Sequence, residues 1–453
     1  MNADAFPAAA SAGDAIALLP PDDAQRASLH NEVHARPTAR VRVPALVVYV
    51  AVDNHGVQRE AEWAHLCQLP GQADLAFSRL SENFLQVRGD GHAVKWERHT
   101  EYTRYTVIQS LPAAAQQGAV GPLLPQVLAV SPAWLAAIPG RTLAAIELVL
   151  VDGDLADPAD VAAAAQRWFG GAPVVASQLG NGYAGTMSDL RIGPSGFERI
   201  VIFAPAGTSV TRAGRMTQRL LELETYRVLA LRGLPVAKAL SPMLAEAETA
   251  LADITANLEN KASSDQDLLD RLVSLAAQVE RATAQHVFRF SATRAYDALV
   301  GQRLAELREK AIPGTQTLGQ FMQHRLSPAM ATVAATAQRL ASLSERVTRT
   351  SALLRTRVDI ATEAQNQQLL EKLTRGQDMQ LRLQSTVEGL SIAAISYYVV
   401  SLLLYGGKAL KGAGVPVNPE IAAGALIPLV LWAVWRTTRR IHARLHRAAD
   451  AGH

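Results

Sequence analysis

The sequence predicts an α+β N-terminal domain with a largely antiparallel sheet, a long all-α stalk and a C-terminal two-helix transmembrane hairpin. Short apolar segments rich in β-branched residues alternate with turn residues up to about residue 210, which is typical of a mixed sheet domain. Beyond that point apolar residues recur every three or four positions, the spacing of one helix face. Two long apolar runs lie near the end of the chain, as membrane spans would.

These changes of pattern divide the chain into five segments. They are an N-terminal arm (1–39), an α+β domain (40–210), a helical stalk (211–388), a transmembrane hairpin (389–437) and a basic tail (438–453). The length of 453 residues is enough for two or three domains with a real core. We expect everything outside the hairpin and its loop to be cytoplasmic.

The α+β domain contains a series of expected strands. Residues 41–52, VRVPALVVYVAV, form a nearly continuous apolar run, which predicts a buried strand. Residues 83–109 alternate in polarity around a Gly-Asp-Gly turn, which predicts adjacent antiparallel strands. Four further strands are expected at 141–153, 172–179, 184–193 and 197–204, and two helices at 56–69 and 158–168.

Several helices are expected in the stalk, where proline and glycine residues mark their ends. A first helix is expected to end at Gly233 with Pro235, and a second to run from Pro242 to about Asn260. A third helix is expected over 265–311, ended by Pro313-Gly314. After Pro328 no proline follows until Pro416. The apolar pattern between them indicates one long helix of a bundle, not a strict two-stranded coiled coil, that runs unbroken into the first membrane span.

Two apolar runs form the predicted hairpin. The first, 389–407, has nineteen residues without a charge, and a helix of this length spans about 28 Å, close to the roughly 30 Å of a bilayer core. The second, 421–435, is shorter and contains Pro428, which a membrane helix tolerates when neighbours satisfy the freed carbonyl. A helical hairpin buried in a soluble core is the alternative interpretation.

Flanking charges predict the orientation of the hairpin. Eight Lys or Arg residues lie outside the two runs, within 372–382 and 436–447, whereas the loop between the runs holds Lys408 and Lys411. The positive-inside rule therefore places both termini in the cytoplasm. The start of the chain lacks the positive region of a secretory signal peptide. We expect a two-pass protein of the plasma membrane.

A polar stripe follows the first apolar run. Its members are separated by three, four or seven positions and so share one helix face: Gln384, Glu388, Ser391, Tyr398, Ser401 and Tyr405. A polar stripe on a membrane helix should not face lipid. We expect it to face the other span, a sister subunit or water in a pore, and we expect a homo-oligomer.

The tail carries a basic stripe with the same spacing. Its members are Arg436, Arg440, Arg444 and Arg447. Such a stripe beside a lipid bilayer attracts anionic lipid headgroups. The alternative is that these arginines act only as determinants of topology.

Two polar clusters are candidates for a metal site. LHNEVHARP holds His30, Glu32 and His34, whose two histidines have the i, i+4 spacing of paired metal ligands on a helix. WERHTEY holds Glu97, His99 and Glu101, which would point to one side of an extended strand. If the segments meet, they offer a metal or acid–base site. The alternative is a hydrogen-bond network that ties the arm to the sheet.

Composition and missing motifs narrow the function classes. A net charge of +3 gives no global basic field, so we expect no nucleic-acid partner. The single Cys67 excludes a disulfide framework within the chain and an all-cysteine zinc site. Since the sequence has no G-x-G-x-x-G after a first strand, no P-loop and no G-x-S-x-G, we expect neither an enzyme nor a cofactor.

Several segments together resemble an uncharacterised family of predicted bacterial membrane-anchored proteins. They are LHNEVHARP, WERHTEY, the Gly182–Asp189 and Gly196–Phe197 region, and GRMTQRLLELETYRVLALRGLP. The likeness covers nearly the whole chain, and HNEVHARP is highly specific. It implies a bacterial inner-membrane protein and brings no known activity, because the family is a domain of unknown function.

The order of segments also resembles CorA-type magnesium channels. That family has a cytoplasmic α/β domain, a long stalk helix running into the first span, a short outer loop, a second span and a basic tail. Its first span ends in Tyr-Gly-Met-Asn, whereas this chain has Tyr405-Gly406-Gly407-Lys408. Glycine offers only its backbone and Lys408 repels a cation, so the same selection of magnesium is not expected.

Three functions follow, in order of preference. The first is a membrane-anchored scaffold, sensor or assembly factor whose domain binds an unknown protein partner. The second is a homo-oligomeric CorA-like ion channel with an altered selectivity loop. The third is a membrane-anchored metal-dependent enzyme that uses the His and Glu clusters.

Overall fold

The computed structural model describes residues 23–26, 29, 40–113, 127–260, 264–413, 416 and 418–450, with the backbone alone for 441–450. The chain forms two compact units. The first comprises the residues up to Asn260 together with Asp270–Arg349, and the second comprises Lys261–Leu269 with Thr350–His453.

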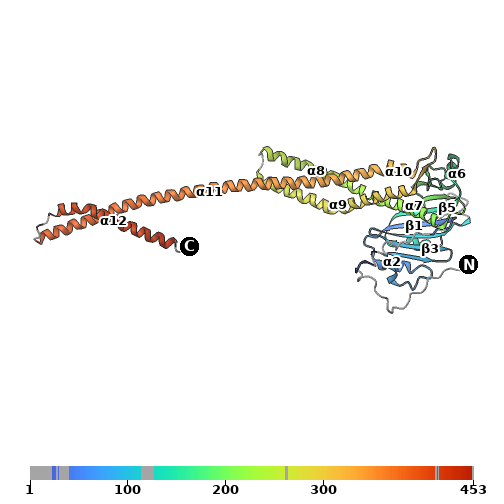
Figure 1. Ribbon diagram of the computed structural model, residues 1–453, viewed down its shortest axis with the longest axis horizontal. Coiled ribbons are helices and arrows are strands. Elements are labelled where there is room, and N and C mark those ends of the chain that lie inside the picture. Colours follow the sequence, from blue (N-terminus) through green and yellow to red (C-terminus); the bar gives the residue numbers. More distant parts are fainter. Residues whose placement is uncertain are drawn as a thin grey trace. The chain divides into compact units, whose positions relative to one another are not determined.

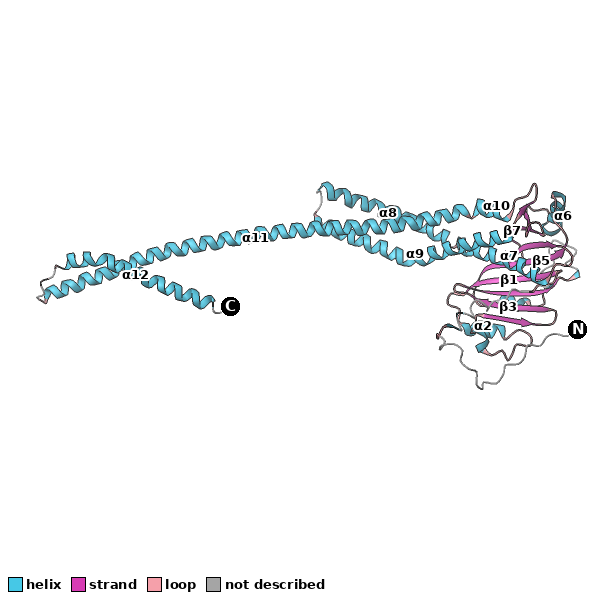
Figure 2. Cartoon of the chain, viewed as in Figure 1, coloured by secondary structure: helices cyan, strands magenta, loops and turns pink. Residues whose placement is uncertain are grey.

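The first unit is built on one sheet of nine strands in the order β2-β3-β4-β1-β5-β8-β7-β6-β9 (Figure 2). β5 and β8 pair in parallel, and every other neighbouring pair is antiparallel. The strands are β1 (Ala45–Asp53), β2 (Phe84–Arg88), β3 (His92–Arg98), β4 (Tyr102–Ser110), β5 (Arg141–Asp152), β6 (Val175–Leu179), β7 (Ala184–Ile192), β8 (Glu198–Ala204) and β9 (Lys310–Ala311). The predicted, largely antiparallel sheet is therefore confirmed.

The central strand β1 is apolar along its length because helices cover both faces of the sheet. Leu46, Val48 and Val50 belong to one apolar cluster, whereas Val47 and Tyr49 belong to another. The first face is covered by α2 (Arg59–Leu66), the short η1 (Phe77–Leu80), α5 (Pro132–Ala136) and α6 (Pro158–Phe169). The second is covered by α7 (Val210–Leu231), α9 (Asp265–Leu307) and α10 (Leu318–Arg325). A strand that is buried on both faces has a continuous run of apolar residues in its sequence.

Helix α6 lies where the sequence predicts it, because its ends are specified locally. The Asp157 side chain accepts hydrogen bonds from the backbone N–H groups of Ala159 at 2.8 Å and Asp160 at 3.0 Å, as part of a capping box. Pro158 occupies the first turn, and Gly170 ends the helix with φ of 62°, a left-handed conformation that suits glycine.

The helix expected to begin at Pro242 in fact begins earlier, and this prediction is wrong. α8 runs from Gly233 to Asn260 with Pro242 inside it. The expected break at Gly233 is confirmed, because α7 ends at Leu231 and α8 begins at Gly233. Gly233 is also a contact point, since a Cβ there would overlap Oγ1 of Thr293 on α9. Ala237 and Leu240, which precede the proline, are buried. This packing stabilises the first turns of the helix, although Pro242 has no backbone N–H to donate to the preceding turn.

Two long helices complete the chain. α11 (Ser327–Gly412) is one helix of 86 residues that includes the whole uncharged run, as expected, and α12 (Pro419–Asp450) includes the second run (Figure 1). Three helical segments in the described residues are long and apolar enough to cross a membrane: Val210–Asn260, Leu318–Gly412 and Pro419–Arg440. Their most apolar windows are 33%, 6% and 11% buried, respectively.

Candidate functional site

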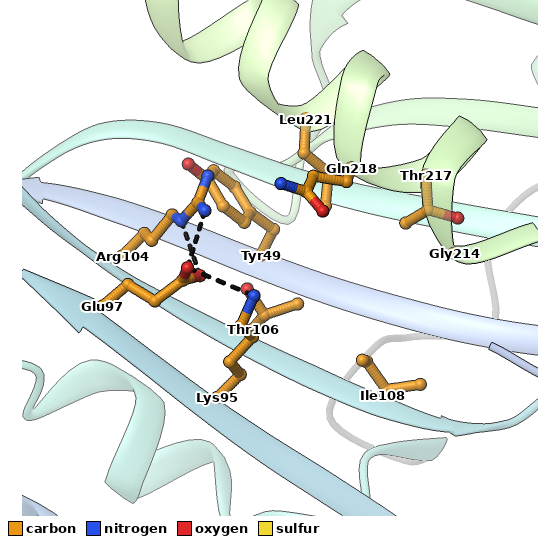
Figure 3. A pocket seen from close by; sticks show the side chains of 10 residues that line it. All are labelled: Tyr49, Lys95, Glu97, Arg104, Thr106, Ile108, Gly214, Thr217, Gln218 and Leu221. Carbon is orange, nitrogen blue, oxygen red and sulfur yellow. Dashed lines mark hydrogen bonds and ion pairs between the residues drawn. The ribbon is translucent and has the colours of Figure 1, made fainter. Parts of the chain in front are cut away.

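A buried ion-pair network surrounds Glu97, one of the residues singled out from the sequence. Glu97 on β3 lies directly across from Arg104 on β4. Arg104 donates from Nε and Nη2 to the two carboxylate oxygens, at 2.7 and 2.8 Å. The ammonium of Lys95 lies 3.1 Å from the same carboxylate. Glu97 therefore has two cationic partners on its own sheet (Figure 3).

The network continues from the sheet into the covering helices. Nη1 of Arg104 donates to Glu222 on α7 at 3.3 Å, and Nε of Arg303 on α9 donates to the second oxygen of Glu222 at 2.6 Å. The hydroxyl groups of Tyr49 on β1 and Thr225 on α7 are hydrogen-bonded at 2.7 Å. These contacts join β1 and β4 to α7 and α9, so the network fixes the two helices to the sheet.

The electrostatics of this network do not suit proton transfer. Burial alone would raise the pKa of Glu97, but the charges and hydrogen bonds of Arg104 and Lys95 outweigh burial and hold this pKa at about 2. Burial raises the pKa of Tyr49 to about 12. The cavity between the strands and α7 has a volume of about 20 Å³, room for a single water molecule. Glu97 therefore remains ionised at neutral pH in a space too small for a substrate.

His99 and Glu101 do not continue the strand that carries Glu97. β3 ends at Arg98, and the two residues lie in the turn before β4. The His99 ring stacks on Tyr102 with centroids 4.4 Å apart. Glu101 accepts a hydrogen bond of 2.6 Å from Arg289 on α9. The two glutamates are thus held in separate ion pairs.

Metal binding stays a prediction for the N-terminal cluster. His30, Glu32 and His34 lie outside the described residues. Within the part of the chain that is described, no group of three or more His, Cys, Asp or Glu side chains could hold a metal ion. Glu97 and Glu101 already have arginine partners, which compete with any cation for their oxygens.

A second, larger pocket opens beside the turn that holds His99. It has a volume of about 450 Å³. Strands, turns and the helices α2, α7 and α9 contribute its lining residues, which are Arg59, Asn83, Arg98, His99, Thr100, Tyr102, Tyr226, Tyr296 and Leu299. Its walls include two stacked ring pairs, His99 with Tyr102 and Tyr226 with Tyr296. A small molecule fits this space, whereas it does not fit the cavity at Glu97.

The two arginines of this pocket are fixed in different ways. Arg98 donates to the buried carboxylate of Glu62 at 2.5 Å and to the carbonyl of Val57 at 2.9 Å. Arg59 donates to the carbonyl of Leu80 at 3.1 Å and to Oδ1 of Asn83 at 2.6 Å. Asn83 adopts φ of 56°, a left-handed conformation that asparagine tolerates better than most residues. Arg59 is therefore held by uncharged acceptors.

The polar stripe on α11 remains largely uncovered within the second unit. None of its six residues is fully buried, and Tyr398 and Tyr405 are each 67% exposed. Ser396, which is not in the stripe, is buried. The described part of the second unit thus leaves most of the stripe exposed.

The basic stripe on α12 begins beside two tryptophans. The guanidinium of Arg436 lies 4.9 Å from the ring centroid of Trp432, and that of Arg439 lies 4.8 Å from that of Trp435. Arg440 and these four residues line one open hollow. Arg444 and Arg447 lie in the helical backbone of α12, and their side chains are outside the described part.

Local sequence patterns do not reveal most partners in these sites. Arg104, Glu222 and Arg303 form the network, and Arg59 and Tyr296 line the larger pocket. One signal was present, because charged residues interrupt apolar segments at Arg104 in YTRYTV and Glu222 in LLELE. Buried charges of this kind are nearly always paired.

The chain was compared with families, curated proteins and solved structures. The model of one family, described as protein of unknown function (DUF3422), matches residues 21–445. Neither the curated proteins nor the solved structures gave a match. Since the matched region contains the sheet, both pockets and the two long helices, the chain belongs to this DUF3422 family.

Proposed function

We propose that this protein is a two-pass membrane protein whose cytoplasmic sheet domain serves as a scaffold, sensor or assembly factor. The observation that carries the proposal is the exposure of the apolar stretches in α11 and α12, of which only 6% and 11% of the residues are buried. Soluble proteins rarely expose apolar surface on this scale, whereas the hydrocarbon core of a bilayer accommodates it.

The exposed side chains are large and lie on two successive helices. They include Leu390, Ile395, Tyr397, Leu402, Leu403, Ile427, Leu429, Leu431, Trp432 and Trp435. The third apolar segment, Val210–Asn260, is different, because Leu220 and Leu229 on α7 are buried against the sheet. Protein, and not lipid, covers these apolar side chains of α7. The contrast supports a membrane hairpin formed by 389–407 and 421–435.

Flanking charges support an orientation with both termini in the cytoplasm of a bacterial inner membrane. The tryptophans at the end of the second run stack with Arg436 and Arg439. Trp residues are enriched at membrane–water interfaces, and arginines there contact lipid phosphates. We place the basic stripe at the cytoplasmic surface, where anionic headgroups are its partners.

A homo-oligomer follows from the uncovered polar stripe. In a single hairpin, Tyr398 and Tyr405 would present their polar groups to lipid, which is unfavourable. A sister subunit or a water-filled pore removes this conflict. A CorA-like channel with an altered selectivity loop is therefore the second candidate function. We assign no catalytic activity, since the arginine-bound Glu97 suits neither an acid nor a metal ligand.

The anchoring is tested by alkaline extraction of membranes that contain the full chain. We expect the protein to remain in the pellet at high pH and to be released only by detergent. A variant with three charges in the first run, Ile395→Arg, Leu402→Arg and Leu403→Arg, should move to the supernatant. A matched variant with Leu369→Arg, Leu373→Arg and Leu383→Arg changes equally exposed leucines outside the run and should stay in the pellet. Release of the unaltered chain by alkali alone would overturn the proposal.

A further inference from the structure

We propose that the pocket beside the β3–β4 turn binds a small phosphate monoester. The inference goes beyond the proposed function, which names no small-molecule ligand for the sheet domain. The pocket combines a volume of about 450 Å³, within the usual range for small-molecule sites, with a lining that contains two arginines and one histidine. None of its nine lining residues is Asp or Glu.

Arg59 supplies the charge for an anion. Its guanidinium donates to a backbone carbonyl and to an amide oxygen, and no ion pair joins it to a carboxylate among the described residues. A guanidinium has five N–H donors, so the two hydrogen bonds of Arg59 leave other donors for a ligand. The second arginine differs, because the buried Glu62 already balances the charge of Arg98. Among the described residues, the pocket therefore retains one positive charge, that of Arg59, without a carboxylate partner.

The position of Arg59 is set before any ligand arrives. Leu80 and Asn83 hold the two ends of its guanidinium at 3.1 and 2.6 Å, so little side-chain entropy remains to be lost on binding. A fixed guanidinium plane recognises phosphate or carboxylate oxygens through paired N–H donors. The neighbouring imidazole of His99 and the hydroxyl of Thr100 line the same pocket. The N–H donors of Arg59 with the hydroxyl of Thr100 beside them suit the three terminal oxygens of a phosphate better than the two of a carboxylate.

The rest of the lining suits the organic part of the ligand. Tyr226 and Tyr296 stack with centroids 6.0 Å apart, and His99 stacks on Tyr102 at 4.4 Å. These rings form flat walls of the kind that contact planar or sugar groups. A pocket of about 450 Å³ has the size of a site for one small molecule. A mononucleotide is therefore a suitable probe for the proposed class.

The test is calorimetric titration of the detergent-solubilised full chain with adenosine 5′-monophosphate, inorganic phosphate and adenosine. We expect saturable binding of the monophosphate, weaker binding of phosphate, and no binding of adenosine. Arg59→Gln should weaken binding of the monophosphate at least about tenfold, because it removes a charged hydrogen-bond donor. Arg88→Gln, an exposed arginine on β2 outside the pocket, is the matched control and should bind normally.

A second pair of variants keeps the test decisive if Arg59→Gln does not fold. Thr100→Glu introduces a carboxylate at an exposed position of the lining and should also weaken binding at least about tenfold by repulsion. Its control, Gln86→Glu, adds the same charge to an exposed position on β2 and should have no effect. The proposal is overturned if neither anion binds, if adenosine binds as tightly as its monophosphate, or if the controls weaken binding as much as the pocket variants.

Discussion

At the scale of residues, the first unit depends on how its buried charges are compensated. Lys95, Glu97, Arg104 and Glu222 are each less than 10% exposed, and each has an oppositely charged partner within 3.3 Å. Buried charges impose a desolvation penalty that only close partners offset. Such a network adds little to net stability while it is complete, but the loss of one member leaves the others buried and uncompensated.

Glu97→Gln should therefore destabilise the fold strongly. The change leaves the buried cations of Lys95 and Arg104 without the carboxylate between them, and breaking such a pair costs about 3–5 kcal/mol. The free energy of unfolding, measured by chemical denaturation of the full chain in detergent, should fall by that amount. Glu60→Gln on the exposed side of α2 is the control and should change it by less than about 0.5 kcal/mol. A similarly small loss for Glu97→Gln would show that the network is not formed.

His65 should make stability depend on pH. Its ring is 3% exposed and stacks on Trp134 with centroids 4.5 Å apart, and burial lowers its pKa to about 4. The unfolded chain, with an ordinary pKa near 6.5, then binds more protons than the folded chain between these values. The contribution of His65 to stability should be complete above about pH 6.5 and decline by about 1–3 kcal/mol as the pH falls towards 4.

The contribution of His65 is measured as a difference between variants, because other groups titrate in the same window. Burial and the neighbouring Glu224 raise the pKa of Glu198 to about 8, an effect of opposite sign that favours the folded state as pH falls. As the pH falls from about 6.5 to about 4, the free energy of unfolding of His65→Leu should decrease less than that of the original chain. The variant His55→Leu, changed at an exposed position, should show the same decrease as the original chain. Equal pH profiles for the original chain and His65→Leu would contradict the prediction.

At the scale of elements, strands and helices that a local pattern specifies could be predicted from the sequence. Elements and ion pairs that depend on tertiary contacts could not. Eight of the nine strands lie in segments whose alternation, β-branched content or turn residues indicated them. β9, only Lys310–Ala311, has no pattern of its own and exists because it pairs with β6. Arg104 and Glu222 meet across 118 positions of sequence, a pairing that no local pattern shows. The pocket at Arg59 was missed for the same reason.

Gly233 is an element-scale case that can be tested directly. Gly233→Ala should lower the free energy of unfolding by about 1–3 kcal/mol, because the added methyl group overlaps Oγ1 of Thr293 and forces α8 and α9 apart. Gly301→Ala is the matched control, since a Cβ at this helical glycine meets nothing within 4 Å. It should raise stability by about 0.5–1 kcal/mol through helix propensity alone. Equal effects from both substitutions would show that the helices do not pack as described.

At the scale of the whole molecule, the main question is how many copies of the chain assemble. The exposed stripe on α11 offers hydroxyl, carboxamide and carboxylate groups that one chain leaves largely uncovered. In a bilayer, such groups are satisfied by other polar groups or by water. Two of the candidate functions, an assembled scaffold and a channel, depend on the number of subunits.

Light scattering of the detergent-solubilised chain, with the detergent mass subtracted, should therefore give more than one copy of the 48.5 kDa chain. The double variant Ser391→Leu with Tyr398→Leu should shift the population towards the monomer. Its apolar helix face is as favourable in contact with lipid as in contact with another subunit. Leu402→Ala, an exposed residue of the same run outside the stripe, should leave the mass unchanged. A pentamer would favour the channel and justify flux assays, whereas a dimer would favour the scaffold. A monomer would contradict the assembly argued from the stripe.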